Sequence, residues 1–326
     1  MEQHVEVDLL IVGAGPVGLY GAYYAGFRGL SVALVDSLPE LGGQITAMYP
    51  EKDIFDVAGF PVIKGKDLVA GLVAQAASAS PTYLLGRTAT ALEATGEQVV
   101  VGLDDGTTVT AQAVIITAGI GKFTPRPLPA ATSWPGDEVA FFVPSFDGYV
   151  GKEVVIVGGG DSAFDWARAL EPLAKSVTLV HRRDAFRAHQ ATVDHVLASS
   201  VQVITNAQVA RLVGEEGLEA VEIELVKAGE TVTVPAQAVV AALGFVADLG
   251  PIQQWGLEVD KRHILVDSTT ATNLPRVYAA GDITEYPGKV RLISVGFGEV
   301  ATAVNNAAVA INPDAHLFPG HSSGGE

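Results

Sequence analysis

Residues 9–26 read LLIVGAGPVGLYGAYYAG, which is an apolar run followed by a glycine-rich turn and a helical segment. The apolar residues Leu9–Val12 predict a buried strand, and Gly13, Gly15 and Gly18 follow it in the pattern G-x-G-x-x-G. In such a turn the first glycine permits a tight bend, the second lets the backbone approach a pyrophosphate, and the third lets the helix pack on the strand. The stretch therefore predicts a strand–turn–helix unit that binds a dinucleotide.

A second copy of this design follows at residues 154–170, VVIVGGGDSAFDWARAL. It predicts a strand over Val154–Val157, a turn over Gly158–Asp161 and a helix over Ser162–Leu170. The repetition goes beyond the glycines, because the later segments TTVTAQAVIITAG and TVTVPAQAVVAALG also match each other. The chain therefore carries two nucleotide-binding folds.

After each motif come segments rich in β-branched residues, in which apolar and polar residues alternate. They predict one antiparallel meander from residue 81 to a strand at Val114–Thr117, and another over about 201–234. The tail has no third glycine motif, and with its helix from about Ser294 to Ile311 it most simply completes the first unit. We expect an α/β protein with two Rossmann-like three-layer nucleotide-binding domains, each with an antiparallel β-meander, the second inserted into the first. The expected boundaries are 1–118 and 248–326 for the first domain and 119–247 for the second.

The first site has features that favour FAD. Asp36 ends the strand after the first helix, where a carboxylate accepts ribose hydroxyls and so favours a cofactor with a free 2′-hydroxyl, FAD or NAD. Nearby Gly43 and Gln44 belong to a flexible segment suited to run along a ribityl chain. Gly281 and Asp282 precede a long helix whose N-terminus can stabilise negative charge on a flavin. An ordinary helix cap is the alternative for this last pair.

The second site ends differently, which favours NADPH. Its glycine turn has Ala163 in place of the last glycine, and the next strand, Val177–His181, runs into HRRDAFRAH. Arginine at this place accommodates a 2′-phosphate, and its planar fork grips phosphate well. A solvated basic helix start is the alternative. The residues expected to bind NADPH are Gly158, Gly160, Asp161, Ser162, His181, Arg182, Arg183 and Arg187.

Two sites with different ribose chemistry imply two different cofactors. FAD in one domain and NADPH in the other predict hydride transfer from nicotinamide C4 to flavin N5. The protein would then orient the two rings and exclude water, and no acid or base residue is assigned to the step.

Composition excludes several classes of function. The 326 residues carry a net charge of −17, which argues against nonspecific nucleic-acid binding. There is no cysteine, so disulfide scaffolds, thiolate metal sites and catalytic dithiols are excluded, and the seven histidines lack metal spacing. No apolar run approaches the roughly 18 residues of a membrane span. The start, MEQHVEVD, is unlike a secretory signal, so we expect a cytoplasmic protein without metal, nucleic-acid or membrane partners.

The chain resembles a known family over nearly its whole length, the thioredoxin-reductase-like ferredoxin–NADP⁺ reductases. Thioredoxin reductases look similar but carry Cys-x-x-Cys-Asp-Gly before the second glycine turn. Here that stretch reads VPSFDG, with Val143 and Phe146 where the thiols would be, so the usual route to a disulfide is absent. The resemblance is carried by GAGPVGLY, LPELGGQ, YPEKDIFDVAGFP, GKFTPR, VGGGDSAFDWA, HRRDAFRAH, VYAAGDI, YPGK and GHSS.

The resemblance implies roles that the residues alone do not. Tyr49 would stack on one face of the flavin, and His321 would cover the other face, across a homodimer, with Ser322 beside the ring. Read without the family, Tyr49 is a half-buried core residue and His321 a tail residue. The remaining contacts expected for FAD are Gly13, Gly15, Gly18, Asp36, Gly43, Gln44, Ala89 through its backbone, Phe123 and Asp282.

The implied electron acceptor is ferredoxin or flavodoxin. Two alternatives stay open: an NADPH diaphorase that serves quinones, free flavin or a partner disulfide protein, and a flavin-binding protein without turnover. Because ferredoxins are usually acidic, docking on this acidic chain needs a local basic patch. Scattered surface cations are the alternative for each candidate, which are Lys52, Lys64, Lys66, Lys289 and Arg291.

Overall fold

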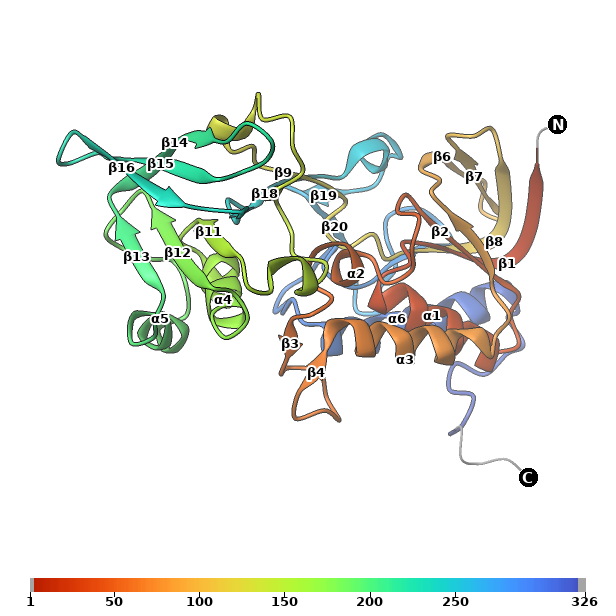
Figure 1. Ribbon diagram of the computed structural model, residues 1–326. Helices are drawn as coiled ribbons and strands as arrows, with labels where there is room; N and C mark the ends of the chain where they lie inside the picture. Colours follow the sequence, from red (N-terminus) through yellow and green to blue (C-terminus); the bar gives the residue numbers. More distant parts are fainter. Residues whose placement is uncertain (1–2, 322–326) are drawn as a thin grey trace. The chain divides into compact units, whose positions relative to one another are not determined.

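The computed structural model describes residues 3–321 and divides the chain into two compact units. Unit 1 comprises Met1–Ala47, Asp53–Lys122 and Ala247–Glu326, and unit 2 comprises Met48–Lys52 and Phe123–Val246. Figure 1 labels their elements. The short piece Met48–Lys52, which the sequence analysis places in the first domain, groups with unit 2. Lys52 Nζ lies 2.6 Å from the Asp165 carboxylate there, and Tyr49 packs against the unit 2 core.

Unit 1 is built on a parallel sheet in the order β5-β2-β1-β8-β21. Its first strand is longer than Leu9–Val12, because the polar start of the chain continues the pairing with β8. The glycine turn leaves the carboxyl end of β1, the edge at which such sheets bind ligands. The strands are β1 (His4–Val12), β2 (Val32–Asp36), β5 (Thr82–Leu85), β8 (Thr108–Ile116) and β21 (Val277–Ala279).

A meander of β6 (Ala89–Ala94) and β7 (Val99–Leu103) joins this sheet through the first half of β8. The expectation that the meander starts at residue 81 is wrong, because β5 pairs in parallel with β2. The same error recurs in unit 2, where β13 (Gln202–Thr205) pairs in parallel with β12 (Ser176–His181) instead of opening the second meander. Each of these strands has only four residues, too few for alternation to reveal its partner.

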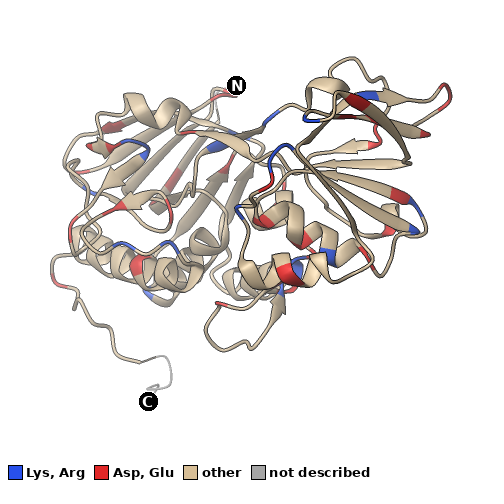
Figure 2. Ribbon diagram, turned by 90° about the vertical axis from the view of Figure 1, so that its left-hand side faces the viewer, with Lys and Arg blue, Asp and Glu red and all other residues tan. Residues whose placement is uncertain are grey.

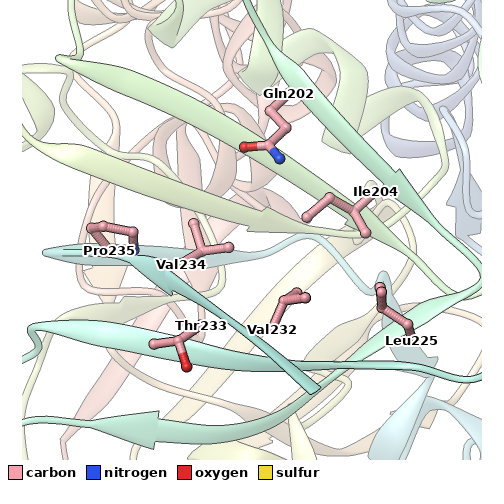
Figure 3. Close-up of a pocket in the computed structure, with 7 residues that line it drawn as sticks. All are labelled: Gln202, Ile204, Leu225, Val232, Thr233, Val234 and Pro235. Atoms are coloured by element: carbon pink, nitrogen blue, oxygen red, sulfur yellow. The ribbon is translucent and has the colours of Figure 1, made fainter. Parts of the chain in front are cut away.

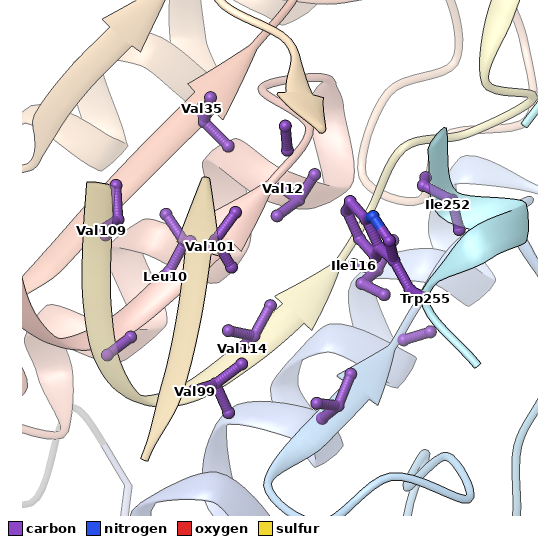
Figure 4. Close-up of a cluster of buried hydrophobic side chains, with 14 of the residues drawn as sticks. Leu10, Val12, Val35, Val99, Val101, Val109, Val114, Ile116, Ile252 and Trp255 are labelled. Carbon is purple, nitrogen blue, oxygen red and sulfur yellow. The ribbon is translucent and has the colours of Figure 1, made fainter. Parts of the chain in front are cut away.

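Three layers make up unit 1. The helices α1 (Pro16–Phe27), α3 (Gly65–Ala77) and α6 (Ile293–Ile311) lie together on one face of the sheet (Figure 1). On the other face, alternate strand residues such as Leu10 and Ile116 belong to one buried cluster with Trp255 from the C-terminal segment, and Trp255 lies beside Ile116 (Figure 4). The smaller elements are α2 (Gln44–Met48), β3 (Asp53–Ile54), β4 (Ile63–Lys64), η3 (Gly250–Gln254), β19 (Val259–Asp260), β20 (His263–Leu265) and β22 (Thr284–Glu285).

Unit 2 repeats the plan with a five-stranded parallel sheet in the order β10-β17-β11-β12-β13. Ile156 packs with Phe164 of α4 in one core cluster, whereas its neighbour Val155 packs with Val221 of the meander in another. Alternation along β11 thus separates a helical layer from a meander layer. The elements are β10 (Val139–Ala140), β11 (Glu153–Val157), α4 (Asp161–Leu170), β12 (Ser176–His181), α5 (Gln190–Leu197), β14 (Ala207–Val213), β15 (Ala220–Leu225), β16 (Glu230–Pro235), β17 (Ala238–Ala241), η1 (Pro129–Ala131) and η2 (Asp147–Tyr149).

The chain crosses between the units twice, at β9 (Lys122–Pro125) and β18 (Phe245–Asp248), and these two strands pair with each other. None of the helices in residues 3–321 combines the length and the apolar character that crossing a bilayer demands.

Candidate functional site: two glycine-rich turns

The first glycine turn leaves one open place beside the start of α1. A Cβ at Gly13, where φ is +116°, would lie 2.5 Å from the Thr117 carbonyl oxygen, and a Cβ at Gly18 would overlap the Gly13 carbonyl oxygen. Gly15 differs, since a Cβ there would meet nothing within 4 Å. Gly15 is also the N-cap of α1, and no side chain caps the helix. Open space before uncapped helix amides is the geometry that receives a pyrophosphate.

Asp36 closes one side of this turn from the end of β2. Its Oδ2 accepts a hydrogen bond from the Ala14 N–H at 2.6 Å, and its Oδ1 accepts one from the Leu38 N–H at 2.9 Å. Burial raises the pKa of Asp36, while these two hydrogen bonds act in the opposite direction. The carboxylate is therefore fixed at the turn, in the place where a ribose diol would be recognised.

The segment after β2 folds back over the same turn. Gly42 N–H donates to the Ala14 carbonyl at 2.9 Å, and a Cβ at Gly43 would lie 3.0 Å from the Cα of Gly15. Gln44 opens α2. Ala89, buried at the start of β6, follows Arg87, whose N–H donates to the Asp36 carbonyl at 3.0 Å. Unit 1 thus gathers most of the residues expected to bind FAD around one turn.

Asp282 lies in a second turn that packs on the start of α1. Gly281, with φ at +84°, approaches so closely that a Cβ would lie 3.2 Å from the Val17 side chain. Burial raises the pKa of Asp282, and the nearby cations Lys289 and Arg291 oppose that shift. Within the described residues its carboxylate accepts no hydrogen bond, which leaves an acceptor available beside the glycine turn.

A buried ion pair between Lys289 and Glu299 holds this turn, and the sequence did not predict it. Lys289 was expected as a docking cation, but its side chain is 1% exposed and its Nζ lies 2.5 Å from Glu299, so that expectation is wrong. Glu299 is the only charged residue of the 19-residue helix α6, a signal in the sequence that could have revealed it. Removal from water of such a cation demands a fixed partner, and Glu299 supplies it.

Three of the other docking candidates also have acidic partners. Lys52 contacts Asp165, Lys64 contacts Asp53, and Arg291 contacts Glu285. Figure 2 shows Lys and Arg scattered among acidic residues. No basic docking patch is therefore assigned.

The second glycine turn opens in the same way at the N-terminus of α4. A Cβ at Gly158 would overlap the Ala242 carbonyl oxygen, whereas a Cβ at Gly160 would meet nothing within 4 Å. The ring of His181 lies where a side chain at Gly159 would be, and its Nε2 is 3.3 Å from the Ala185 carbonyl. Burial lowers the pKa of His181, which favours the neutral ring.

The arginine-containing loop after β12 is fastened to this turn. Arg187 N–H donates to the Gly159 carbonyl at 2.8 Å, and His189 N–H donates to Oδ1 of Asp161 at 2.8 Å. The ring of Phe186 meets that of Phe164 edge-on, with centroids 4.8 Å apart. These contacts bring the loop beside exposed Ser162 at the start of α4.

Three exposed guanidinium groups in this loop have no acidic partner. Arg182, Arg183 and Arg187 make no side-chain hydrogen bond or ion pair within residues 3–321. The planar fork of arginine suits a phosphate dianion, and binding of a 2′-phosphate by these three residues remains a prediction.

Of the remaining predicted residues, three lie away from the two glycine turns, and the fourth falls outside the part of the chain that the structure describes. Tyr49 packs against the unit 2 core, and Phe123 meets the rings of Phe142 and Phe245 with centroids 6.0 and 6.2 Å away. His321 is exposed, edge-on to Phe318 at 5.2 Å, and Ser322 lies outside the described residues. The flavin contacts of all four therefore remain predictions.

A groove of about 410 Å³ in unit 2 contains none of the predicted residues (Figure 3). No titratable group lines it, so it offers no acid, base or charged ligand. The described part of the chain also lacks any cluster of three acidic or histidine side chains suited to a metal ion. The lining residues are Gln202, Ile204, Leu225, Val232, Thr233, Val234 and Pro235.

Comparisons with known proteins agree with two dinucleotide sites. Residues 7–308 match the family described as pyridine nucleotide-disulphide oxidoreductases. A ferredoxin–NADP reductase from a Nocardioides species is 70% identical over 98% of this chain and 98% of its own length. One from Frankia alni is 62% identical over 97% and 98%. A crystal structure of T. acidophilum thioredoxin reductase has a TM-score of 0.76 and 27% identity, covering 95% of this chain and 98% of that one.

Proposed function

The chain belongs to the pyridine nucleotide-disulphide oxidoreductase family, and on that premise we propose that it is a ferredoxin–NADP⁺ reductase with FAD as its resident cofactor. The observation that carries the proposal is the difference between its two open glycine turns. One is closed by the Asp36 carboxylate, and the other is flanked by unpaired arginines. A carboxylate suits a free ribose diol, and arginines suit a 2′-phosphate, so the sites fit FAD and NADPH respectively.

Because the chain has no cysteine pair, electrons cannot pass from the flavin to an internal disulfide. Val143 is wholly buried, and Phe146 meets the ring of Trp166 with centroids 6.3 Å apart, so both positions serve as core. Neither side chain can accept electrons, which favours direct delivery to an external carrier. FAD, when bound, supplies the conversion between the two-electron chemistry of NADPH and the one-electron chemistry of ferredoxin.

The chain's own residues bind and orient. In unit 1 the open place at Gly15 and the α1 amides would hold the pyrophosphate of FAD, Asp36 its ribose, and Asp282 a hydroxyl of the ribityl chain. In unit 2 the Gly160 turn would hold the NADPH pyrophosphate, and Arg182 and Arg183 its 2′-phosphate. Tyr49 and His321 are proposed to shield the flavin from water.

Two finer points complete the proposal. We propose a homodimer, as the family resemblance implies, and the exposed Phe318 beside His321 supports a tail that packs on another surface. We propose a cytoplasmic location, because NADPH and an iron–sulfur carrier would both be available there.

Steady-state kinetics with ferredoxin tests this function. With NADPH as donor, cytochrome c reduction should rise at least about ten-fold when ferredoxin is added, because the carrier is the natural one-electron acceptor. The control is ferricyanide reduction, which needs no docking.

Two results would contradict the proposal. Cytochrome c reduction that ferredoxin does not stimulate, in a protein that reduces quinones or ferricyanide rapidly, would make the protein a diaphorase. NADPH oxidation no faster than in buffer, by a protein that holds FAD, would make it a flavin-binding protein without turnover.

A further inference from the structure

A buried ion pair lies under the turn that carries Asp282. Lys289 Nζ is 2.5 Å from Oε1 of Glu299, and their side chains are 1% and 8% exposed. The Tyr286 hydroxyl donates to the same carboxylate oxygen at 2.6 Å, and this bond raises the pKa of Tyr286 to about 12. Oε1 of Glu299 therefore accepts hydrogen bonds from two donors.

The pair grips both backbone groups of one residue, Gly281. The other carboxylate oxygen of Glu299, Oε2, accepts the Gly281 N–H at 2.7 Å. The Gly281 carbonyl accepts a hydrogen bond from Lys289 Nζ at 2.9 Å, and one from the Thr284 hydroxyl at 2.8 Å. Gly281 has φ at +84°, a backbone conformation that other residues rarely adopt. The position and direction of the next residue, Asp282, are therefore fixed by the ion pair.

Stability alone is a poor reason for this arrangement. A buried ion pair loses its hydration, and apolar residues of similar volume are often as stabilising or better. Moreover, α6 is otherwise free of charged residues, so Glu299 stands alone in an apolar surface. The ion pair instead defines the geometry of one turn. Its hydrogen bonds end on the backbone of Gly281, which packs on Val17 next to the first glycine turn and directly precedes the unpartnered Asp282 carboxylate.

We propose that Lys289, Glu299 and Tyr286 are positioning residues for FAD, which act by holding the Gly281–Asp282 turn so that the Asp282 carboxylate meets the cofactor. The inference rests on the proposed function, in that it takes FAD as the ligand of unit 1. It assigns these three residues to binding of the cofactor and gives them no contact with the reacting atoms.

The test measures FAD affinity of the apoprotein by fluorescence titration. Glu299→Gln and Lys289→Met should each raise the FAD dissociation constant about ten-fold or more, because each leaves a buried charge without its counter-ion and loosens the turn. Tyr286→Phe, which removes one hydroxyl and disturbs folding least, should raise it about three-fold. Lys175→Met is the matched control, since Lys175 is a 67% exposed cation paired with Glu153. It should change nothing.

Two further measurements distinguish a positioning role for FAD from a purely structural role. Affinity for 2′,5′-ADP, a probe of unit 2, should stay within about two-fold of wild type in all variants, because Lys289, Glu299 and Tyr286 all belong to unit 1. In an Asp282→Ala background, which removes the acceptor, Glu299→Gln should cost less than about two-fold in FAD affinity, because no side chain is left for the ion pair to position.

The results that overturn the inference are equally defined. Variants that bind FAD as tightly as wild type, even with lowered melting temperatures, would make the ion pair structural only. A full ten-fold loss that persists in the Asp282→Ala background would show that Glu299 does not act through Asp282. If wild-type apoprotein takes up no FAD, the proposed function falls together with this inference.

Discussion

Arg182→Ala/Arg183→Ala should lower kcat/KM for NADPH by about 100-fold or more and leave kcat/KM for NADH within about two-fold, because two charge-assisted bonds of about 1.5–3 kcal/mol each are lost. Both guanidinium groups are exposed and have no acidic partner among residues 3–321, so their removal breaks no contact within the protein. NADH lacks the 2′-phosphate, and the loss should therefore fall on one nucleotide only. Steady-state kinetics with both nucleotides and a saturating acceptor measures the ratio.

Arg211→Ala is the matched control for these variants. Arg211 lies in the same unit and is 65% exposed, but it is paired with Glu222. It should leave the preference between the nucleotides unchanged. Equal losses with NADPH and NADH in the double variant would mean that the two arginines support the loop and do not read the phosphate.

Gly15→Ala should give a colourless protein that melts at the same temperature as the wild-type apoprotein, because the substitution removes bound FAD and leaves the fold intact. Its backbone angles, φ −73° and ψ −175°, suit alanine, and the new methyl group would meet nothing within 4 Å in the protein itself. The space it fills is the place proposed for the pyrophosphate. Loss of two hydrogen bonds to a charged group predicts FAD affinity lowered by about 100-fold or more. Titration of the apoprotein and a thermal melt measure the two quantities separately.

Substitutions at two other glycines serve as comparisons for Gly15→Ala. Gly71→Ala, in α3 and also without a neighbour within 4 Å, should keep FAD affinity and slightly stabilise the helix. Gly18→Ala should lower the melting temperature as well as the affinity, because its methyl group would overlap the Gly13 carbonyl oxygen. Full FAD affinity in Gly15→Ala would place the pyrophosphate elsewhere.

Local patterns in the sequence predicted the two strand–turn–helix units well. An apolar run, a glycine turn and a helix are adjacent in the chain, so α4 begins within one residue of the expected Ser162 and α6 within one of Ser294. The partners of short strands are set by contacts with segments far away in the chain, and the four-residue β5 and β13 were accordingly given the wrong partners. Periodicity carries no information about which neighbour such a strand will find.

The sequence pattern also failed to predict which charged side chains are buried. Lys289 lies in a polar stretch, YPGK, that reads as a surface loop, yet its side chain is buried. Its partner is ten residues away in an apolar helix, and only the packing of the turn onto α6 brings the two together. An isolated acidic residue in an apolar helix is a sign that a buried cation or donor lies opposite.

Anaerobic titration of the FAD-loaded protein with NADPH, followed at the flavin absorbance, tests most directly whether two differently tuned nucleotide sites serve one electron-transfer reaction. One equivalent of NADPH should bleach the bound flavin on mixing, while the same amount of NADH should do so at least about ten-fold more slowly, because it lacks the phosphate that the arginines would bind. Bleaching by both nucleotides at the same rate, or a protein that stays unreduced by NADPH, would contradict this prediction.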